Sequence, residues 1–210
     1  MVKCVRRGSN ETQILKYLKE CGGPAHHIIE LLDVIPFEGS QLIVLHDLVS
    51  LTGLHIRMSL NSSIVSSLQT QFLEGVEYLH EHGVAHMSLN PQDVVIDLKK
   101  QKNPPILFIT NFDSAVRVKG VDTMCKGSRW VGEWWIAPEV SNEHEYSAIL
   151  ADRWSCGRTF EFFRTHMVVA PLNEELSEEI SRKLMDVNPT LRPVLRDCVM
   201  LSRRIELGQV

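Results

Sequence analysis

The sequence has no long apolar run, no excess of positive charge and no paired cysteine motif. No stretch approaches the roughly 20 apolar residues of a membrane-spanning helix, and the first residues lack the apolar core of a secretory signal. A formal net charge of -4 gives no electrostatic reason to bind the phosphates of nucleic acid. We therefore expect an intracellular, cytoplasmic protein that binds neither a membrane nor nucleic acid.

The five cysteines are scattered and form no CxxC pair, which excludes a disulfide framework and a zinc site of the usual spacing. The nine histidines likewise lack the spacing of metal ligands. Apolar residues make up 44% of the chain and charged residues 23%, as in ordinary globular proteins. A chain of 210 residues can bury one substantial core, so we expect one folded unit.

The periodicity of apolar residues predicts strands in the first half of the chain and helices mainly in the second. The predicted strands cover residues 1–5, 28–35, 42–45, 94–97 and 106–109, and the predicted helices cover residues 11–20, 61–82, 151–165, 174–186 and 191–207. This order indicates an α+β fold. Residues 113–139 are predicted to be mostly irregular, and a loop of that length is uncommon unless it is functional.

Three short motifs follow one another in the middle of the chain. They are HMSLNPQDVV at residues 86–95, NFD at 111–113 and APE at 137–139. In protein kinases the corresponding motifs are H-R-D-L-x-x-x-N, D-F-G and A-P-E. YLH at 78–80, DRWSCG at 152–157 and NPTLRP at 188–193 also match that family in order and spacing. The chain resembles the eukaryotic protein-kinase-like superfamily over nearly its whole length.

The resemblance implies a protein-kinase-like fold in two parts. Residues 1–50 correspond to a remnant of the small β lobe, entered at its third strand, and residues 51–210 to the mainly helical large lobe. The two strands and the glycine-rich loop that cover the phosphates in the family are not in this sequence. The resemblance is therefore to an N-terminally truncated domain, for which we expect no cofactor, or only weak binding of ATP and Mg²⁺.

The residues that carry kinase chemistry are replaced. Ser88 stands where the family has its aspartate base, and a hydroxyl cannot serve as that base near neutral pH. Asn90 stands in place of the lysine that neutralises the transferred phosphoryl group. Asn111 replaces the metal-binding aspartate of D-F-G, and Asp113 replaces its glycine. The resemblance therefore implies a degenerate site with no intact catalytic residue.

Three residues remain as candidates for binding a nucleotide or a metal. Lys3 and Glu11 resemble the lysine–glutamate pair that the family places at the phosphates. The alternative is that Lys3 is a frayed terminal residue and Glu11 an acid favoured by the helix dipole. Asp93 replaces the asparagine that binds a metal ion, and its carboxylate is a suitable hard ligand; the alternative is a solvated loop acid.

Other matching residues have architectural roles in the family. Glu139 and Arg192 resemble a buried ion pair, and Asp152 resembles an acid that accepts backbone hydrogen bonds from the catalytic loop. The remaining structural candidates are His86 in that loop, Phe112, whose packing couples the two lobes, and Trp154, which packs beneath the loop.

The leading hypothesis is a catalytically inactive pseudokinase that binds another, unidentified protein as a scaffold. Two alternatives remain: a weak ATP-dependent serine/threonine phosphotransferase or nucleotide-responsive switch, and a decayed kinase fragment without function. The segments SRW at 128–130 and WW at 134–135 are candidates for a binding surface, because tryptophan and arginine are common at interfaces. Packing in the core is the alternative for these rings.

Overall fold

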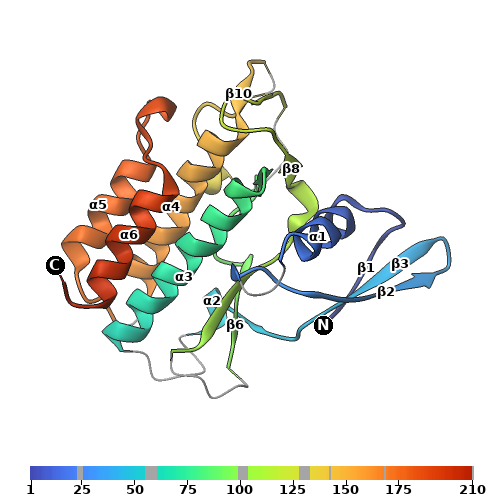
Figure 1. Cartoon of the computed structure of the whole chain (residues 1–210), viewed down its shortest axis with the longest axis horizontal. Helices are drawn as coiled ribbons and strands as arrows, with labels where there is room; N and C mark the ends of the chain where they lie inside the picture. The colour runs from blue at the N-terminus through green and yellow to red at the C-terminus, as the bar shows by residue number, and fades with distance from the viewer. Residues whose placement is uncertain are drawn as a thin grey trace.

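The computed structural model describes residues 1–22, 26–54, 61–98, 104–127, 133–141, 143–167 and 169–209. An N-terminal sheet with one helix lies at one end of the molecule, and most of the helices lie side by side at the other end (Figure 1). These helices are α3 (Ser62–Glu81), α4 (Ala148–His166), α5 (Glu174–Leu184) and α6 (Leu195–Glu206). No helix in the described ranges is long and apolar enough to cross a membrane.

The N-terminal sheet is antiparallel, with strand order β1–β3–β2. Its strands are β1 (Val2–Arg6), β2 (Leu31–Phe37) and β3 (Ser40–Leu45). Side chains alternate between the two faces of a strand, and Val5, Ile43 and Leu45 are buried on one face. Helix α1 (Asn10–Glu20) buries Ile14, Leu15 and Leu18 in the same core. The residues on either side of Lys3 in β1 are exposed. Because side chains alternate along the strand, the Lys3 side chain points toward the interior of the molecule.

Helix α3 is the long helix that the apolar periodicity predicted. Its cap is Asn61, whose side-chain oxygen accepts a hydrogen bond from the Ile64 amide at 2.9 Å. Phe72 is completely buried, and its ring centroid lies 6.0 Å from that of Phe163 on α4. Because α3 packs against both α4 and α6, it forms the centre of the helical part.

Short strands fix the positions of the loops that contain the kinase-like motifs. Strands β4 (Val49–Ser50), β6 (Val94–Asp97) and β7 (Ile106–Ile109) form one sheet, in which Val94 lies opposite Ile109. Strand β5 (Val84–Ala85) pairs with β8 (Val116–Arg117), and β9 (Met124–Cys125) pairs with β10 (Tyr146–Ser147). Residues 86–93 precede β6 and residues 110–113 follow β7, so the two motif loops lie side by side.

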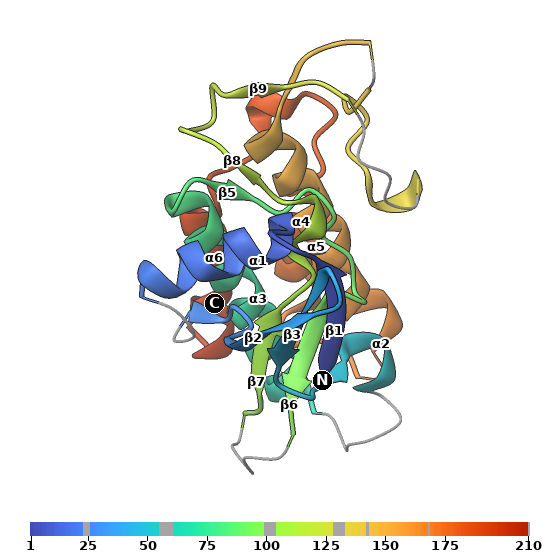
Figure 2. The same cartoon turned by 90° about the vertical axis from the view of Figure 1, so that its right-hand side faces the viewer.

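The remaining elements are short. Helix α2 (Leu51–Leu54) follows β4, and 3-10 turns occur at Phe112–Ser114, Glu133–Trp135 and Pro189–Leu191. Ile28 forms an isolated bridge with Ile109, which connects the segment after α1 to β7. Figure 2 shows α1 and the N-terminal sheet facing the viewer, with α4 and α5 behind them.

The predicted α+β fold is confirmed, whereas several predicted boundaries are wrong. Helix α4 begins at Ala148 rather than at 151, because Ser147 caps it through the Leu150 amide. The helix predicted over 191–207 begins only at Leu195, since Pro193 and the 3-10 turn before it interrupt the α-helical hydrogen bonds. The boundary proposed after residue 50 falls between β4 and α2 and remains a prediction.

Candidate functional site

A buried carboxylate from helix α4 organises the loop that contains the first motif. The Asp152 side chain accepts hydrogen bonds from the backbone amides of His86 at 2.8 Å and Met87 at 2.9 Å, and contacts His80 Nε2 at 2.9 Å. Burial alone would raise the pKa of Asp152, but the hydrogen bond from His80 and the nearby histidine charges lower it below its usual value.

Met87 has a left-handed φ of 63°, which costs conformational energy, and the hydrogen bond from its amide to Asp152 holds the backbone in this conformation.

His86 connects the first motif to the second. Its Nε2 lies 2.9 Å from the Thr110 carbonyl oxygen, and its ring centroid lies 5.0 Å from that of Phe112. A nitrogen that faces a carbonyl oxygen must donate, so the His86 Nε2 carries a proton, and Nδ1 is the nitrogen that faces Ser88. The Ser88 hydroxyl lies 3.2 Å from that Nδ1, and both side chains are buried. Ser88 therefore supplies a neutral hydroxyl, already hydrogen-bonded, at the position where the family places its base.

The Lys3 ammonium group is surrounded by acceptors. It lies 2.6 Å from Glu11 Oε2, 2.8 Å from Asp113 Oδ2 and 3.2 Å from Asn111 Oδ1. Burial alone would lower the pKa of Lys3, but the hydrogen bonds and charges of Asp113 and Glu11 raise it above its usual value. The alternative in which Lys3 is a frayed terminal residue is therefore wrong.

Asp93 is held by two asparagine side chains. Its Oδ1 accepts a hydrogen bond from Asn111 Nδ2 at 2.8 Å, and its Oδ2 accepts one from Asn90 Nδ2. The residue is 4% exposed, so the interpretation of Asp93 as a solvated loop acid is wrong. Burial raises the pKa of Asp93 to about 6, against the opposing effects of His86, Asn111 and Lys3.

The structure brings an aspartate and an asparagine together in exchanged positions. Asp93 occupies the family's asparagine position and Asn111 occupies its aspartate position, yet the two side chains contact each other directly. The pair therefore still offers one carboxylate and one amide. Asn111 has a left-handed φ of 68°, which turns the chain into the 3-10 turn at 112–114.

A nucleotide with its magnesium ion does not fit these side chains as they are arranged. An ammonium group has three N–H donors, and Lys3 directs them at three internal acceptors. Magnesium requires oxygen ligands in nearly octahedral geometry, whereas Asn90 and Asn111 direct amide N–H groups, and not oxygens, at the Asp93 carboxylate. Within the part of the chain that the structure describes, no three His, Cys, Asp or Glu side chains are grouped closely enough to hold a metal ion.

The architectural residues form the contacts that the resemblance implied. Arg192 makes a bidentate ion pair with Glu139, at 2.5 Å and 2.9 Å, and also donates to the carbonyl oxygens of Leu150 and Asp186. Trp154 is partly buried and, like Met87, packs against the buried cluster that contains Ala137. These contacts fasten the APE segment and the first motif to helix α4.

Among the aromatic candidates, Trp134 and Trp135 have different surroundings. Trp134 is 76% exposed, and its carbonyl oxygen accepts a hydrogen bond from Arg158 at 3.3 Å. Trp135 is partly buried, with its ring centroid 6.5 Å from that of Phe162. Residues 128–130 lie outside the described residues. Packing in the core therefore does not account for the position of the Trp134 side chain.

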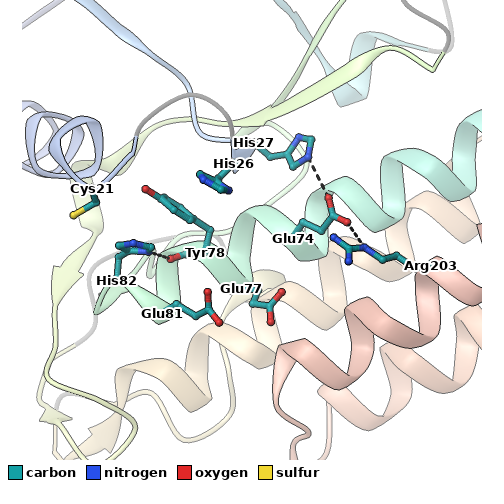
Figure 3. Close-up of a pocket in the computed structure, with 9 residues that line it drawn as sticks. All are labelled: Cys21, His26, His27, Glu74, Glu77, Tyr78, Glu81, His82 and Arg203. Atoms are coloured by element: carbon teal, nitrogen blue, oxygen red, sulfur yellow. Dashed lines mark hydrogen bonds and ion pairs between the residues drawn. The ribbon is translucent and has the colours of Figure 1, made fainter.

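A separate hollow of about 400 Å³ lies beside α3 and contains none of the predicted site residues (Figure 3). Glu74 lies at one side of it, between His27 at 3.2 Å and Arg203 at 2.7 Å. On the other side the ring of Tyr78 stacks on His26, with 4.3 Å between centroids. This hollow is distinct from the cluster around Lys3.

Two residues that contribute to the cluster around Lys3 were not predicted from the sequence to make these contacts. The Asn10 side chain donates to the carbonyl oxygens of Phe112, Asp113 and Ala115, at 3.1, 3.1 and 2.7 Å. Its position beside Glu11 gave no signal, because a polar residue at the start of a helix is usual. The contact of Asp113 with Lys3 was also missed, although the replacement of the family's glycine marked that position as unusual.

Comparison with known proteins agrees with this geometry. Residues 2–198 match the family model described as the protein kinase domain. The chain is 29% identical over 163 residues to "Mitogen-activated protein kinase kinase kinase 1" of Arabidopsis thaliana, covering 75% of this chain and 24% of that protein. It is also 29% identical over 166 residues to "Probable serine/threonine-protein kinase RTK1" of Saccharomyces cerevisiae, covering 73% of this chain and 26% of that protein. The chain thus spans about a quarter of the length of these relatives. With its motif loops on the paired strands β6 and β7 and this match across nearly its whole length, the chain belongs to the protein kinase domain family.

Proposed function

We propose that this protein kinase domain is a pseudokinase, which does not transfer phosphate and acts by binding another protein. The observation that carries the proposal is the state of the site around Lys3 and Asp93. The ammonium of Lys3 directs its three donors at neighbouring side chains, and each oxygen of the Asp93 carboxylate accepts an amide hydrogen from a neighbouring asparagine. Ser88 offers no negative charge at the position of the base. Loss of a base and of a metal ligand typically lowers kcat by orders of magnitude.

Contacts outside the catalytic positions support a structural role for this domain. The Asp152 hydrogen bonds and the Glu139–Arg192 ion pair keep the kinase architecture together, although the catalytic positions have changed. A domain that retains its architecture without its chemistry is suited to presenting a surface to a partner. The retained architecture and the replaced catalytic residues together favour the scaffold over the weak phosphotransferase and over the decayed fragment.

The first test is the thermal midpoint of the purified chain with ATP, with and without Mg²⁺. A ligand at about 100 times its Kd stabilises a protein by roughly 2.7 kcal/mol, which is readily measured. We expect no shift at millimolar ATP and no transfer of radiolabelled γ-phosphate to the chain or to a basic protein substrate. A Lys3→Met variant is the matched control. A Mg²⁺-dependent shift or transfer that this variant abolishes would overturn the proposal of inactivity and favour the weak phosphotransferase.

The second test concerns the partner surface. Trp134 is largely exposed, and exposed tryptophans that anchor an interface commonly contribute about 2 kcal/mol or more, which corresponds to about 30-fold in Kd. We expect Trp134→Ala to weaken binding of a partner captured by the immobilised chain by that factor, with an unchanged thermal midpoint. Val187→Ala, at a residue that is 79% exposed, is the control. Equal affinities for the parent and the Trp134→Ala variant would remove this surface from the proposal.

A further inference from the structure

The carboxylate of Asp113 is an additional anion at Lys3. The family motif has glycine at this position, which offers no side chain. Here Asp113 Oδ2 lies 2.8 Å from the ammonium nitrogen, and Glu11 Oε2 lies on another side of it at 2.6 Å. The Asp113 side chain is 53% exposed, whereas that of Glu11 is 1% exposed. Asp113 therefore contacts the ammonium from the side that is open to solvent, from which a ligand would approach.

Backbone contacts hold Asp113 in this place. Asn10, at the first turn of α1, donates to the carbonyl oxygens of Phe112, Asp113 and Ala115. The Phe112 amide donates to Glu11 Oε1 at 3.3 Å. The 3-10 turn is thus attached to helix α1 on both sides of Asp113. Its carboxylate reaches Lys3 without any movement of the main chain.

The local charge disfavours a second anion. Glu11 and Asp113 together carry two negative charges against the one positive charge of Lys3. The Asn111 side chain accepts a hydrogen bond from the Lys3 ammonium and donates one to Asp93. Asp93 therefore adds a further negative charge near Lys3 when it is ionised. A polyphosphate that approached Lys3 would have to displace Asp113 and would be repelled by the remaining carboxylates. Both effects lower the affinity of this site for phosphate groups.

We propose that Asp113 is an internal anion that takes the place of nucleotide phosphates at Lys3 and so links strand β1 to the 112–114 turn without any ligand. The inference rests on the proposed function, since it explains how a pseudokinase can keep its lysine–glutamate pair while excluding nucleotide. It assigns to Asp113 the exclusion of phosphate-bearing ligands. It also makes the connection between β1 and the turn independent of the nucleotide concentration.

The test measures the binding of sodium tripolyphosphate and of Mg²⁺-free ATP by isothermal titration calorimetry at low salt. Asp113→Gly restores the family residue, and Asp113→Asn keeps the size of the side chain while removing its charge. We expect both variants to bind tripolyphosphate at least about tenfold more tightly than the parent, because an ion pair and a repulsion are removed together. Salt should weaken this binding, since the charges involved are partly exposed.

Two controls make the result specific. Asp122→Asn changes the net charge equally at an exposed loop residue and should leave tripolyphosphate binding as in the parent. Adding Lys3→Met to Asp113→Asn should abolish the gain. Equal affinities for parent and Asp113 variants would overturn the inference, and so would a gain that persists without Lys3. Phosphate transfer from ATP by the parent chain would instead overturn the proposed function, so the two failures are distinguishable.

Discussion

A Glu139→Ala variant is expected to lose about 3–5 kcal/mol of its free energy of unfolding, the typical cost of removing one partner from a buried ion pair. The Arg192 side chain has no exposed surface, while that of Glu139 is 20% exposed. Without Glu139, the guanidinium would remain charged and buried with only carbonyl oxygens as acceptors. Water can approach through the exposed part of Glu139, which places the expected loss toward the lower end of that range. Urea denaturation followed by circular dichroism measures it.

Two further variants show whether the loss comes from the buried charge. Glu179→Ala removes an i,i+4 ion pair with Lys183 in which both side chains are largely exposed, and it should leave the denaturation midpoint nearly unchanged. The double variant Glu139→Ala with Arg192→Met removes both charges and should recover part of the loss, because no uncompensated charge stays buried. A Glu139→Ala variant as stable as the parent would show that the ion pair does not hold the APE segment.

The sequence predicted the helices and the longer strands because their apolar residues repeat with a clear period. In α3, Ile64, Leu68, Phe72 and Leu79 lie at helical spacing and are all buried. The two-residue strands carry no such period, so β5 and β8 could not be predicted. Residues just outside the two strands extend their pairing, since the Gly83 carbonyl oxygen accepts a hydrogen bond from the Val118 amide.

The positions of the motifs were predictable, whereas the contacts of the candidate site were only partly so. The pairing of Lys3 with Glu11 followed from the resemblance. The contact between Lys3 and Asp113 joins residues separated by 110 positions, and nothing in local periodicity encodes it. The burial of Asp93 was missed for the same reason, because it depends on Asn111 from the neighbouring loop. Replacements at motif positions therefore marked where the chemistry had changed, but not which new contacts had formed.

The free energy of unfolding should contain a contribution from Asp93 that decreases as the pH rises. The pKa of Asp93 is about 6 in the folded chain, compared with its ordinary value of 3.8. A carboxyl group with a raised pKa stabilises the fold fully below about pH 3.8, and this contribution is lost as the pH rises through about 6. A difference of about two pKa units corresponds to about 3 kcal/mol. Compared with Asp93→Asn, which cannot titrate, the parent should lose about that amount between pH 4 and pH 7.

The same pH series distinguishes a metal-binding acid from a carboxyl group that is tied to neighbouring amides. A magnesium ion bound at Asp93 would favour the ionised form and flatten the profile. We expect the profiles with and without Mg²⁺ to coincide, because Asn90 and Asn111 direct amide N–H groups at both oxygens. Glu175→Gln, at an exposed position of α5, controls for the loss of one carboxyl group. A parent-minus-Asp93→Asn difference that stayed constant from pH 4 to pH 7 would contradict the burial argument. A profile that Mg²⁺ flattens would instead return Asp93 to the role of a metal ligand and, with it, make phosphate transfer by this chain worth measuring again.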